Sequence, residues 1–393
     1  MNILMISDVY FPRINGVSTS IETFRRALSE RGVNSTLIAP AYPGAERDEP
    51  DLLRTPSRYI PLDPEDRMMR SSAIRLRHAD LQTQGFDAVH IHTPFVAHYA
   101  GLEIARKLGL PCLATYHTFF EEYLFHYVPM LPKSWLRSLA RRFSRGQCNA
   151  MDRVIVPSRA MASALSNYGV RQPLQVLPTG IPEEQFHGGD GCYFRNRYGI
   201  SKDKQLLLYV GRVAHEKNIS FLLDMVDHLR RSNPRVLLLI TGEGPALPSL
   251  QAEAERKNLN AHVRFLGYLD RGSELHDCYR AADLFVFASR TETQGLVLLE
   301  AMALGTPVVA LADMGTRDIL AGERGCRIAP PYADSFADLV GKLLDDSASL
   351  HQLGEEARET ALEWKAEEMA ARLESVYAET IASRFPASKL RPA

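Results

Sequence analysis

Short apolar runs alternate with amphipathic stretches along most of the chain. The first run, NILMIS, has the length of a β-strand, and the stretch VSTSIETFRRALSERG after it predicts a helix that ends at Gly32. Further runs of strand length follow in the first half of the chain: STLIAP, DAVHIHT, PCLATYHT, RVIVPS and QVLPTG. Strands that alternate with helices predict βαβ units, and therefore a mainly parallel, doubly wound α/β sheet.

The alternation is interrupted near the middle of the chain. The segment GIPEEQFHGGDGCYFRNRYGI has five glycines in a polar context, which predicts a domain boundary. Strand-length runs then resume with QLLLYVGR, RVLLLITGEG, VRFLGYL, DLFVFAS, TPVVAL and GCRIA, and after about residue 333 the pattern is helical. We therefore predict two Rossmann-like domains, residues 1–185 and 186–365, with ligands in a cleft between the carboxyl edges of their strands.

The composition is that of an ordinary globular protein. Of 393 residues 45% are hydrophobic and 24% charged, and the formal net charge of −1 favours no class of partner. Residues 1–185 nevertheless carry 21 Lys and Arg against 18 Asp and Glu, whereas the remainder carries 25 against 29. The N-terminus lacks the long apolar region of a signal peptide, and no window of about 18 apolar residues occurs, so we expect a cytoplasmic protein without a membrane-spanning segment.

The cysteines are far apart and form no C-x-x-C pair. This spacing indicates neither a zinc site nor a disulfide framework, so we expect buried free thiols. The five residues are Cys112, Cys148, Cys192, Cys278 and Cys326.

Two cations follow the run QLLLYVG and precede an amphipathic helix. They are Arg212 and Lys217. At the carboxyl edge of a strand such residues can bind phosphate oxygens, Arg through a planar fork and Lys as a point charge. The alternative is an ordinary solvated loop. The nearby TGEGPAL (241–247) resembles the start of a dinucleotide fingerprint, but its third glycine is missing, which favours a simple tight turn.

A pair of acids brackets a predicted helix N-terminus in the stretch SRTETQGLVLLEAMALGTPVVA. Glu292 and Glu300 lie eight positions apart, and a helix over residues 295–304 would begin at Gly295 and Leu296. Free backbone N–H groups at that end suit a diphosphate, and each carboxylate can accept hydrogen bonds from two hydroxyls. A nucleotide sugar has this layout of sugar hydroxyls, diphosphate and ribose hydroxyls. Acids that only complement the helix dipole are the alternative, but Glu300 lies too far into the helix for that role.

The combination of GRVAHEK with TETQGLVLLEAMALGTPVVA resembles the nucleotide-sugar site of the retaining family-4 glycosyltransferases. The family's E-x7-E motif is matched by Glu292 and Glu300, and its Arg/Lys pair by Arg212 and Lys217. One departure is Gln294, since the family commonly has Phe before the motif glycine.

This resemblance covers essentially the whole chain. It implies the GT-B fold, in which two Rossmann-like domains face each other across a cleft, with the C-terminal helix at about 366–393 packing back on the first domain. It also implies a UDP-hexose donor, no metal cofactor, and front-side attack in which the leaving phosphate takes the acceptor proton.

Two motifs in the first domain extend the resemblance. Gly16, in the loop after the first strand, looks like the family's glycine loop that closes over the diphosphate. His117, in TYHTFFEEYLFHYVP, matches a histidine that contacts the donor sugar, although an isolated histidine is more often structural. This context, together with HTPF (92–95) and VLPTGI (176–181), resembles the diacylglycerol glucosyltransferases and implies diacylglycerol or a related lipid as the acceptor.

The segment LPKSWLRSLARRFSRGQ, residues 131–147, predicts a membrane-binding helix. At 100° per residue Trp135, Leu136, Leu139, Ala140 and Phe143 fall within about 140° of arc, opposite five cations. This pattern is typical of a helix that lies in an anionic membrane surface; the alternative is a core-facing helix with a solvated basic face. The candidate membrane residues are Lys133, Trp135, Arg137, Arg141, Arg142, Phe143 and Arg145, and a second cluster of Arg67, Arg70, Arg75 and Arg77 could join them.

The sequence therefore predicts a peripheral enzyme on the inner face of the cell membrane that moves a hexose from a UDP-sugar to a lipid. Arg212, Lys217 and the helix N-terminus would stabilise the departing diphosphate, while His117 and Glu292 hold the sugar. The rivals are a family member with a soluble or other acceptor, such as a mannosyltransferase, and a catalytically silent sugar-nucleotide-binding module. Nucleic-acid binding is not expected, because no aromatic residues are interleaved with the basic cluster. The sequence does not separate glucose, galactose and glucuronic acid, and it does not predict the oligomeric state.

Overall fold

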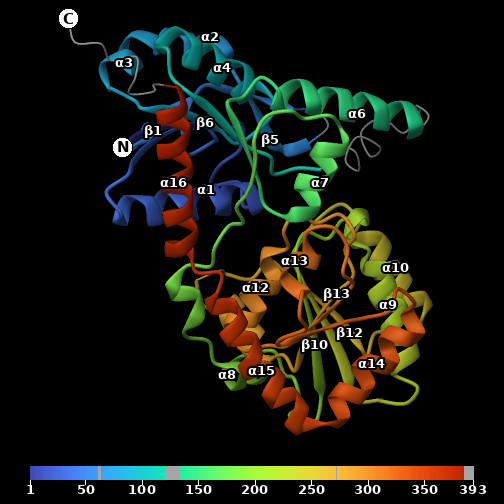
Figure 1. Ribbon diagram of the computed structural model, residues 1–393. Helices are drawn as coiled ribbons and strands as arrows, with labels where there is room; N and C mark the ends of the chain where they lie inside the picture. The colour runs from blue at the N-terminus through green and yellow to red at the C-terminus, as the bar shows by residue number, and fades with distance from the viewer. Residues whose placement is uncertain (61–62, 120–132, 271, 385–393) are drawn as a thin grey trace, which may run out of the picture. The chain divides into compact units, whose positions relative to one another are not determined.

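The computed structural model describes residues 1–60, 63–119, 133–270 and 272–384 (Figure 1). The chain divides into two compact units: unit 1 is Met1–Gly180 with helix α16 (Ala366–Arg384), and unit 2 is Ile181–Lys365. The domain boundary predicted after residue 185 is therefore slightly late. Ile181 already belongs to unit 2, where its N–H donates to the carbonyl of Trp364 at 2.7 Å.

Unit 1 is built on a seven-stranded parallel sheet with the order β3-β2-β1-β6-β7-β8-β9. The strands are β1 (Asn2–Ile6), β2 (Asn34–Pro40), β3 (Leu52–Thr55), β6 (Ala88–Ile91), β7 (Cys112–Thr115), β8 (Arg153–Val156) and β9 (Leu174–Val176). The first strand lies inside the sheet and is fully buried from Ile3 to Ile6, as expected for a parallel strand covered on both faces. A separate antiparallel hairpin, β4 (Ser57–Ile60) and β5 (Asp63–Met69), was not predicted, because DPEDRMM has no apolar alternation.

The helices of unit 1 begin and end at recognisable signals. The Asn15 side chain caps the first helix by accepting from Ser18 N–H at 2.9 Å, and the predicted stop at Gly32 is confirmed. The helices are α1 (Gly16–Glu30), α2 (Ser71–Leu76), α3 (His78–Thr83), α4 (Val96–Leu108), α6 (Lys133–Cys148) and α7 (Arg159–Asn167). Residues 131–132 of the predicted membrane helix lie outside the described residues.

The C-terminal helix α16 belongs to unit 1, where it packs against α1. Leu373 and Tyr377 of α16 share a buried cluster with Ile21, Phe24 and Leu28 of α1. The chain thus returns from unit 2 to complete the core of unit 1. Residues 385–393, which the sequence assigned to this helix, lie outside the described part of the chain.

Unit 2 is a six-stranded parallel sheet with the order β12-β11-β10-β13-β14-β15. The strands are β10 (Gln205–Val210), β11 (Val236–Thr241), β12 (Val263–Gly267), β13 (Leu284–Phe287), β14 (Val308–Ala310) and β15 (Cys326–Ile328). The helices are α8 (Gly191–Arg197), α9 (Ile219–Leu229), α10 (Leu247–Arg256), α11 (Glu274–Ala281), α12 (Leu296–Ala303), α13 (Thr316–Leu320), α14 (Ala333–Asp345) and α15 (Ser347–Leu362), with two short 3₁₀ turns at Glu183–Phe186 and His215–Lys217. The prediction of two doubly wound α/β domains is confirmed.

Within the described residues, no helix is both long enough and apolar enough to cross a membrane. All five cysteines are free, and four of them are buried. The expectation of buried thiols is wrong for Cys192, which is exposed, because α8 turns Phe194 rather than Cys192 toward the core.

Candidate functional site

The candidate donor residues of unit 2 follow two neighbouring strands. Strand β10 lies between β11 and β13, so the chain winds in opposite directions on its two sides, and the carboxyl ends of β10 and β13 form the switch point at which ligands of such sheets bind. The loop after β10 carries Arg212 and Lys217, and the loop after β13 carries Glu292. The fold therefore places both predicted motifs at one sheet edge.

These two loops are joined by a salt bridge. Lys217 Nζ lies 2.5 Å from Glu292 Oε1, and the two side chains are only 19% and 16% exposed. The sequence predicted that the lysine binds phosphate and that the acid binds sugar, but not that the two side chains pair. Asn218 forms a second contact between the two loops, because its side-chain Nδ2 donates a hydrogen bond to the carbonyl of Ala288 at 3.1 Å. The backbone of Asn218 is left-handed, with φ +57°.

The predicted helix after Glu292 is α12, which begins at Leu296 after the N-cap Gly295. Gly295 has φ +96°, and a Cβ on it would lie 3.2 Å from Thr316 Cγ2. This position therefore favours glycine for both backbone and packing reasons. The result is a helix N-terminus with its N–H groups at the switch point, as the sequence predicted.

Glu300 lies one turn further along α12. The residue is only 6% exposed, and its Oε2 accepts a hydrogen bond from Tyr279 Oη at 2.9 Å. Tyr279 is almost fully buried in α11 and orients the carboxylate. The sequence gives no signal for this tyrosine, because it lies 21 positions before Glu300 and no local pattern links the two.

Backbone groups of the loop that carries Arg212 make the contacts that hold the loop in place. The carbonyl of Arg212 accepts from Tyr209 Oη at 3.1 Å. A Cβ on Gly242 would lie 2.0 Å from the carbonyl oxygen of Gly211, so glycine permits the TGEG turn to contact this loop. The interpretation of TGEG as a structural turn is thus supported by its packing.

The loop after β14 also supports the site, and it was not singled out from the sequence. Gly315 N–H donates to the carbonyl of Glu292 at 2.8 Å, and Thr316 Oγ1 donates to the carbonyl of Asp313 at 2.7 Å. The Gly315–Thr316 turn therefore fixes the backbone just before α12. The sequence contains no indication of this turn, because the family motif ends at β14, before Gly315.

In unit 1 the predicted His117 follows strand β7. Its Nε2 lies 3.2 Å from His92 Nδ1, and the two rings stack with centroids 5.5 Å apart. Burial lowers the pKa of His117 to about 4, so the imidazole is neutral at physiological pH. The sequence predicted no separate role for His92, which is the first residue of HTPF. Its Nε2 is buried and has no hydrogen-bond partner among the described residues.

Two further buried groups lie beside this histidine pair. His90 contacts Tyr377 Oη through Nδ1 at 2.6 Å and Thr115 Oγ1 through Nε2 at 2.7 Å. Asp8 accepts from Thr93 Oγ1 at 2.8 Å, and burial raises its pKa to about 6. Despite these groups, the described residues contain no cluster of three or more His, Cys, Asp or Glu that could hold a metal ion.

Gly16 is the first residue of α1, at the carboxyl edge of the unit 1 sheet. Its φ does not lie in the left-handed region, and a Cβ on it would meet no described atom within 4 Å. The fold of unit 1 therefore does not require glycine here, in contrast to Gly295.

The apolar residues predicted to form one membrane-facing stripe on helix α6 do not all lie on the surface. Leu136 and Ala140 are buried, whereas Trp135 is 74% and Leu139 is 56% exposed, and Phe143 is half-buried. The apolar residues thus form two faces, because the arc of about 140° is wider than the strip that is buried. Four predicted cations on the same helix are also exposed: Arg137, Arg141, Arg142 and Arg145. Lys133 begins the helix, but its side chain lies outside what the structure describes.

Comparison with known proteins agrees with this geometry. The family model for group 1 glycosyl transferases matches residues 193–360, and that for glycosyltransferase family 4 matches residues 14–185. An alpha-monoglucosyldiacylglycerol synthase of Streptococcus pneumoniae is 30% identical over 392 residues, which cover 98% of this chain and 87% of that protein. A GDP-mannose-dependent alpha-mannosyltransferase of Mycobacterium tuberculosis is 28% identical over 367 residues, with coverages of 88% and 89%.

Among solved structures, sucrose-phosphate synthase from Thermosynechococcus elongatus has a TM-score of 0.79 at 21% identity, over 97% of this chain and 99% of that one. This likeness shows the GT-B fold. With two family models that together span both units, and a relative at 30% identity over nearly the whole chain, the protein belongs to the family-4 glycosyltransferases of the GT-B fold.

Proposed function

We propose that this glycosyltransferase moves a hexose from a UDP-sugar to a membrane lipid, with diacylglycerol as the acceptor and with retention of the anomeric configuration. The observation that carries the donor half is the meeting of Lys217, Glu292 and the N-terminus of α12 at the switch point of unit 2. Cations, helix N–H groups and buried carboxylates together match a diphosphate with hydroxyl-bearing groups on both sides.

The two acids have different roles in this proposal. Glu300, oriented by Tyr279, accepts hydrogen bonds from the ribose hydroxyls. Glu292 accepts from the hydroxyls of the transferred sugar. Its ion pair with Lys217 is compatible with this role, because an ammonium group has three N–H donors and a carboxylate accepts at two oxygens.

The positive groups stabilise the leaving group. Arg212, Lys217 and the N-terminus of α12 complement the charge that develops on the departing UDP, so the proposal includes no metal. The leaving phosphate then takes the proton of the acceptor hydroxyl, which avoids the need for a separate enzyme base. By the family resemblance, we assign Gly16 of unit 1 to a glycine loop that binds diphosphate, and neutral His117 to recognition of the donor sugar.

The lipid half of the proposal rests on α6 and on the relatives. Trp135 and Leu139 are exposed apolar side chains on a helix with four exposed arginines, a combination that suits an anionic membrane surface. A relative that is a monoglucosyldiacylglycerol synthase favours diacylglycerol as the acceptor. The enzyme would act as a peripheral protein on the inner face of the cell membrane.

A mannosyltransferase is the second candidate, because a relative of similar length is GDP-mannose-dependent. One experiment separates the two. The full-length protein is incubated with vesicles that contain diacylglycerol and an anionic phospholipid, and with UDP-glucose, UDP-galactose, UDP-glucuronic acid or GDP-mannose. Mass spectrometry then identifies the glycolipid, and NMR its anomeric configuration. Turnover with GDP-mannose alone, or no glycolipid product with any of the UDP-sugars, would reject the proposed activity.

A further inference from the structure

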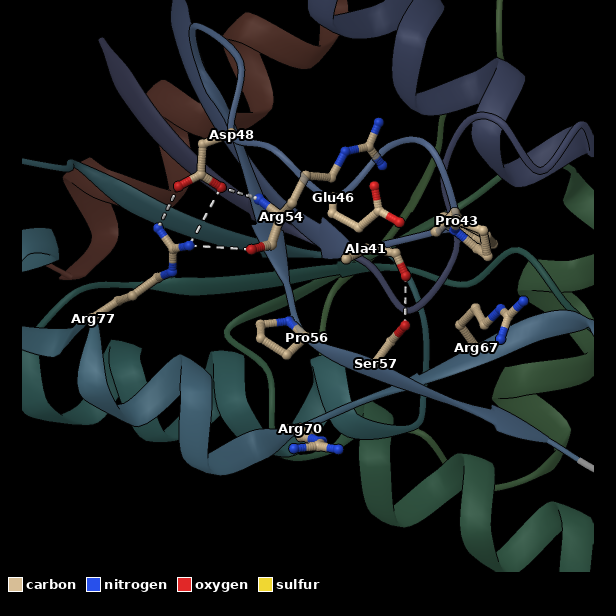
Figure 2. A pocket seen from close by; sticks show the side chains of 11 residues that line it. Ala41, Pro43, Glu46, Asp48, Arg54, Pro56, Ser57, Arg67, Arg70 and Arg77 are labelled. Atoms are coloured by element: carbon tan, nitrogen blue, oxygen red, sulfur yellow. Dashed lines mark hydrogen bonds and ion pairs between the residues drawn. The ribbon is translucent and has the colours of Figure 1, made fainter.

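Unit 1 contains a cavity of about 580 Å³ that shares no residue with the candidate donor site (Figure 2). The cavity lies beside the carboxyl ends of β2 and β3 and the hairpin β4–β5. Its polar lining is rich in arginine and comprises Glu46, Asp48, Arg54, Ser57, Arg67, Arg70 and Arg77. We propose that this pocket binds a phosphate ester of a polyol.

Backbone and side-chain hydrogen bonds hold the walls of the pocket together. Ser57 Oγ donates to the carbonyl of Ala41 at 2.5 Å, and Ala41 N–H donates to the carbonyl of Thr55 at 2.8 Å. Arg70 N–H donates to the carbonyl of Pro56 at 2.8 Å. The end of β2, the β3–β4 connection and the start of α2 are thus linked, and the pocket is part of the packed fold of unit 1.

Arg54 is the buried cation of the pocket. The residue is only 5% exposed, and its guanidinium donates to the carbonyls of Phe11 at 2.8 Å and Pro40 at 3.2 Å. Its Nε is buried and has no hydrogen-bond partner among the described residues. A buried donor without a partner is costly, so this group favours an acceptor that enters the pocket.

Arg67 shows the same feature on a different wall. Its guanidinium lies over the Tyr59 ring, 5.7 Å from the centroid, which fixes the side chain. Its Nε is also buried and unpartnered within the described part of the chain. Figure 2 shows Arg54, Arg67 and Arg70 on three sides of the pocket.

The charges of the pocket do not cancel. Arg77 is neutralised by Asp48, with Nη1 and Oδ2 3.0 Å apart. The other charged residues that line the pocket are three cations, Arg54, Arg67 and Arg70, and one acid, Glu46. Glu49 lies 3.6 Å from Arg54. The excess positive charge, presented by guanidinium groups with planar forks, suits a phosphate.

Glu46 narrows the class of ligand. Its Oε1 accepts from Gly44 N–H at 2.9 Å, and a carboxylate oxygen has further lone pairs. A second anion next to this carboxylate would be repelled, whereas a hydroxyl group would be bound. The pocket therefore suits a phosphate with a hydroxyl-bearing alcohol, such as a glycerophosphate, either free or as a lipid headgroup.

The test is binding of glycerol 3-phosphate to the full-length protein by calorimetry, with inorganic phosphate and glycerol as comparison probes. We expect glycerol 3-phosphate to bind more tightly than inorganic phosphate, and glycerol not to bind. Saturating UDP should not compete, because the pocket and the donor site have no residue in common. Competition by UDP would overturn the proposal. So would a failure of both phosphate probes to bind in solution, together with no binding of the phosphatidylglycerol headgroup.

Matched variants locate the site. Arg67→Gln and Arg70→Gln should each weaken glycerol 3-phosphate at least about tenfold while UDP affinity stays unchanged. Arg58→Gln is the control, because Arg58 is exposed on the same hairpin and does not line the pocket. Glu46→Gln should tighten inorganic phosphate and reduce the preference for the glycerol ester. Unchanged affinity in both arginine variants would place the ligand elsewhere and refute the pocket.

A second arm identifies the source of the ligand. Nanodiscs with phosphatidylglycerol are compared with nanodiscs that carry the same density of phosphatidylserine, which has no polyol. Binding that favours phosphatidylglycerol, and loses this preference in Arg67→Gln, identifies a lipid headgroup. Tight binding of free glycerol 3-phosphate without that preference identifies a soluble metabolite. Neither outcome depends on the transfer reaction, so failure of the proposed function would not affect this test.

Discussion

Lys217 Nζ lies 2.5 Å from Glu292 Oε1 and thereby joins the loops that follow two neighbouring strands of the unit 2 sheet. The two residues are 75 positions apart and come from different sequence motifs. Substitution of either residue alone leaves the other as a partly buried charge without its counterion. The two residues should therefore behave as one unit.

The first prediction follows from this pair. Lys217→Ala should reduce turnover about 10²–10³-fold, because it removes a positive charge near the leaving group. If the pair is a unit, the double variant Lys217→Ala with Glu292→Ala should lose much less than the product of the two single losses. A double-mutant cycle on kcat/KM measures this, with thermal melts as the control for folding. Fully additive losses would contradict coupling between the two residues.

The second prediction separates the two acids. Glu300→Ala should weaken UDP itself, since Glu300 accepts from the ribose, whereas Glu292→Ala should spare UDP and reduce turnover with the UDP-sugar. Hydrogen bonds to charged groups are worth about 1.5–3 kcal/mol. Tyr279→Phe provides a matched test, because it removes only the hydroxyl that orients Glu300 and should weaken UDP more mildly. Calorimetry with UDP checks all three, and equal loss of UDP affinity in both acid variants would reject the assignment.

The third prediction compares two glycines. Gly295→Ala places a Cβ 3.2 Å from Thr316 Cγ2 at φ +96°, so it should lower the melting temperature and the affinity for UDP. Gly16→Ala meets no described atom within 4 Å and replaces glycine at the start of a helix, so the melting temperature should not fall. Its turnover should fall nevertheless if a ligand approaches this backbone. Full activity of Gly16→Ala would reject that role for the loop.

Much of this architecture could be predicted, because it depends on local pattern. The apolar runs that became β1, β10 and β13 are continuous, as buried parallel strands require, and Gly32 stops α1 by its conformation alone. The acids Glu292 and Glu300 stand out in the sequence because they flank the predicted start of a helix, and α12 does begin between them.

The remaining features arise from contacts between distant segments. The hydrogen bond from Tyr279 of α11 to Glu300 of α12 exists only in the folded chain, and the arginine pocket forms only when the hairpin β4–β5 contacts β2. Helix α6 shows a different limit. Leu136 and Trp135 are both apolar in the sequence, and only tertiary packing decides that Leu136 is buried and Trp135 is exposed.

The fourth prediction concerns pH. Burial lowers the pKa of His90 to about 3 and that of His117 to about 4, from an ordinary value of 6.5. Between the lowered and the ordinary pKa the unfolded chain binds more protons than the folded chain, so the free energy of unfolding should fall as the pH drops below about 6.5. Asp8, whose pKa burial raises to about 6, has the opposite effect below that pH, but burial also lowers the pKa values of His92 and His98, so the histidines outnumber it.

Calorimetric melts from neutral to mildly acidic pH check this expectation. His90→Gln is uncharged at every pH, so its melting temperature should fall less steeply with acid, whatever its value at neutral pH. A wild-type melting temperature that does not change between pH 7 and pH 5 would contradict the sign of the effect.

The last prediction concerns the outer face of α6. Reversing Arg137, Arg141 and Arg145 to Glu should abolish binding to anionic vesicles, since each cation near such a surface contributes about 1 kcal/mol. UDP affinity should stay intact, because none of these residues lies in unit 2. Replacing exposed Trp135 and Leu139 with Ser should also weaken vesicle binding, but without lowering the melting temperature.

Leu136→Ser is the matched control, because Leu136 is buried and its loss should lower the melting temperature instead. Salt distinguishes the two contributions further, since it screens the arginines but not the apolar pair. Vesicle sedimentation, together with thermal melts on the same variants, measures both effects. If the charge-reversed protein still sediments with anionic vesicles, α6 is not the membrane anchor, and a water-soluble acceptor becomes the better explanation of this enzyme's chemistry.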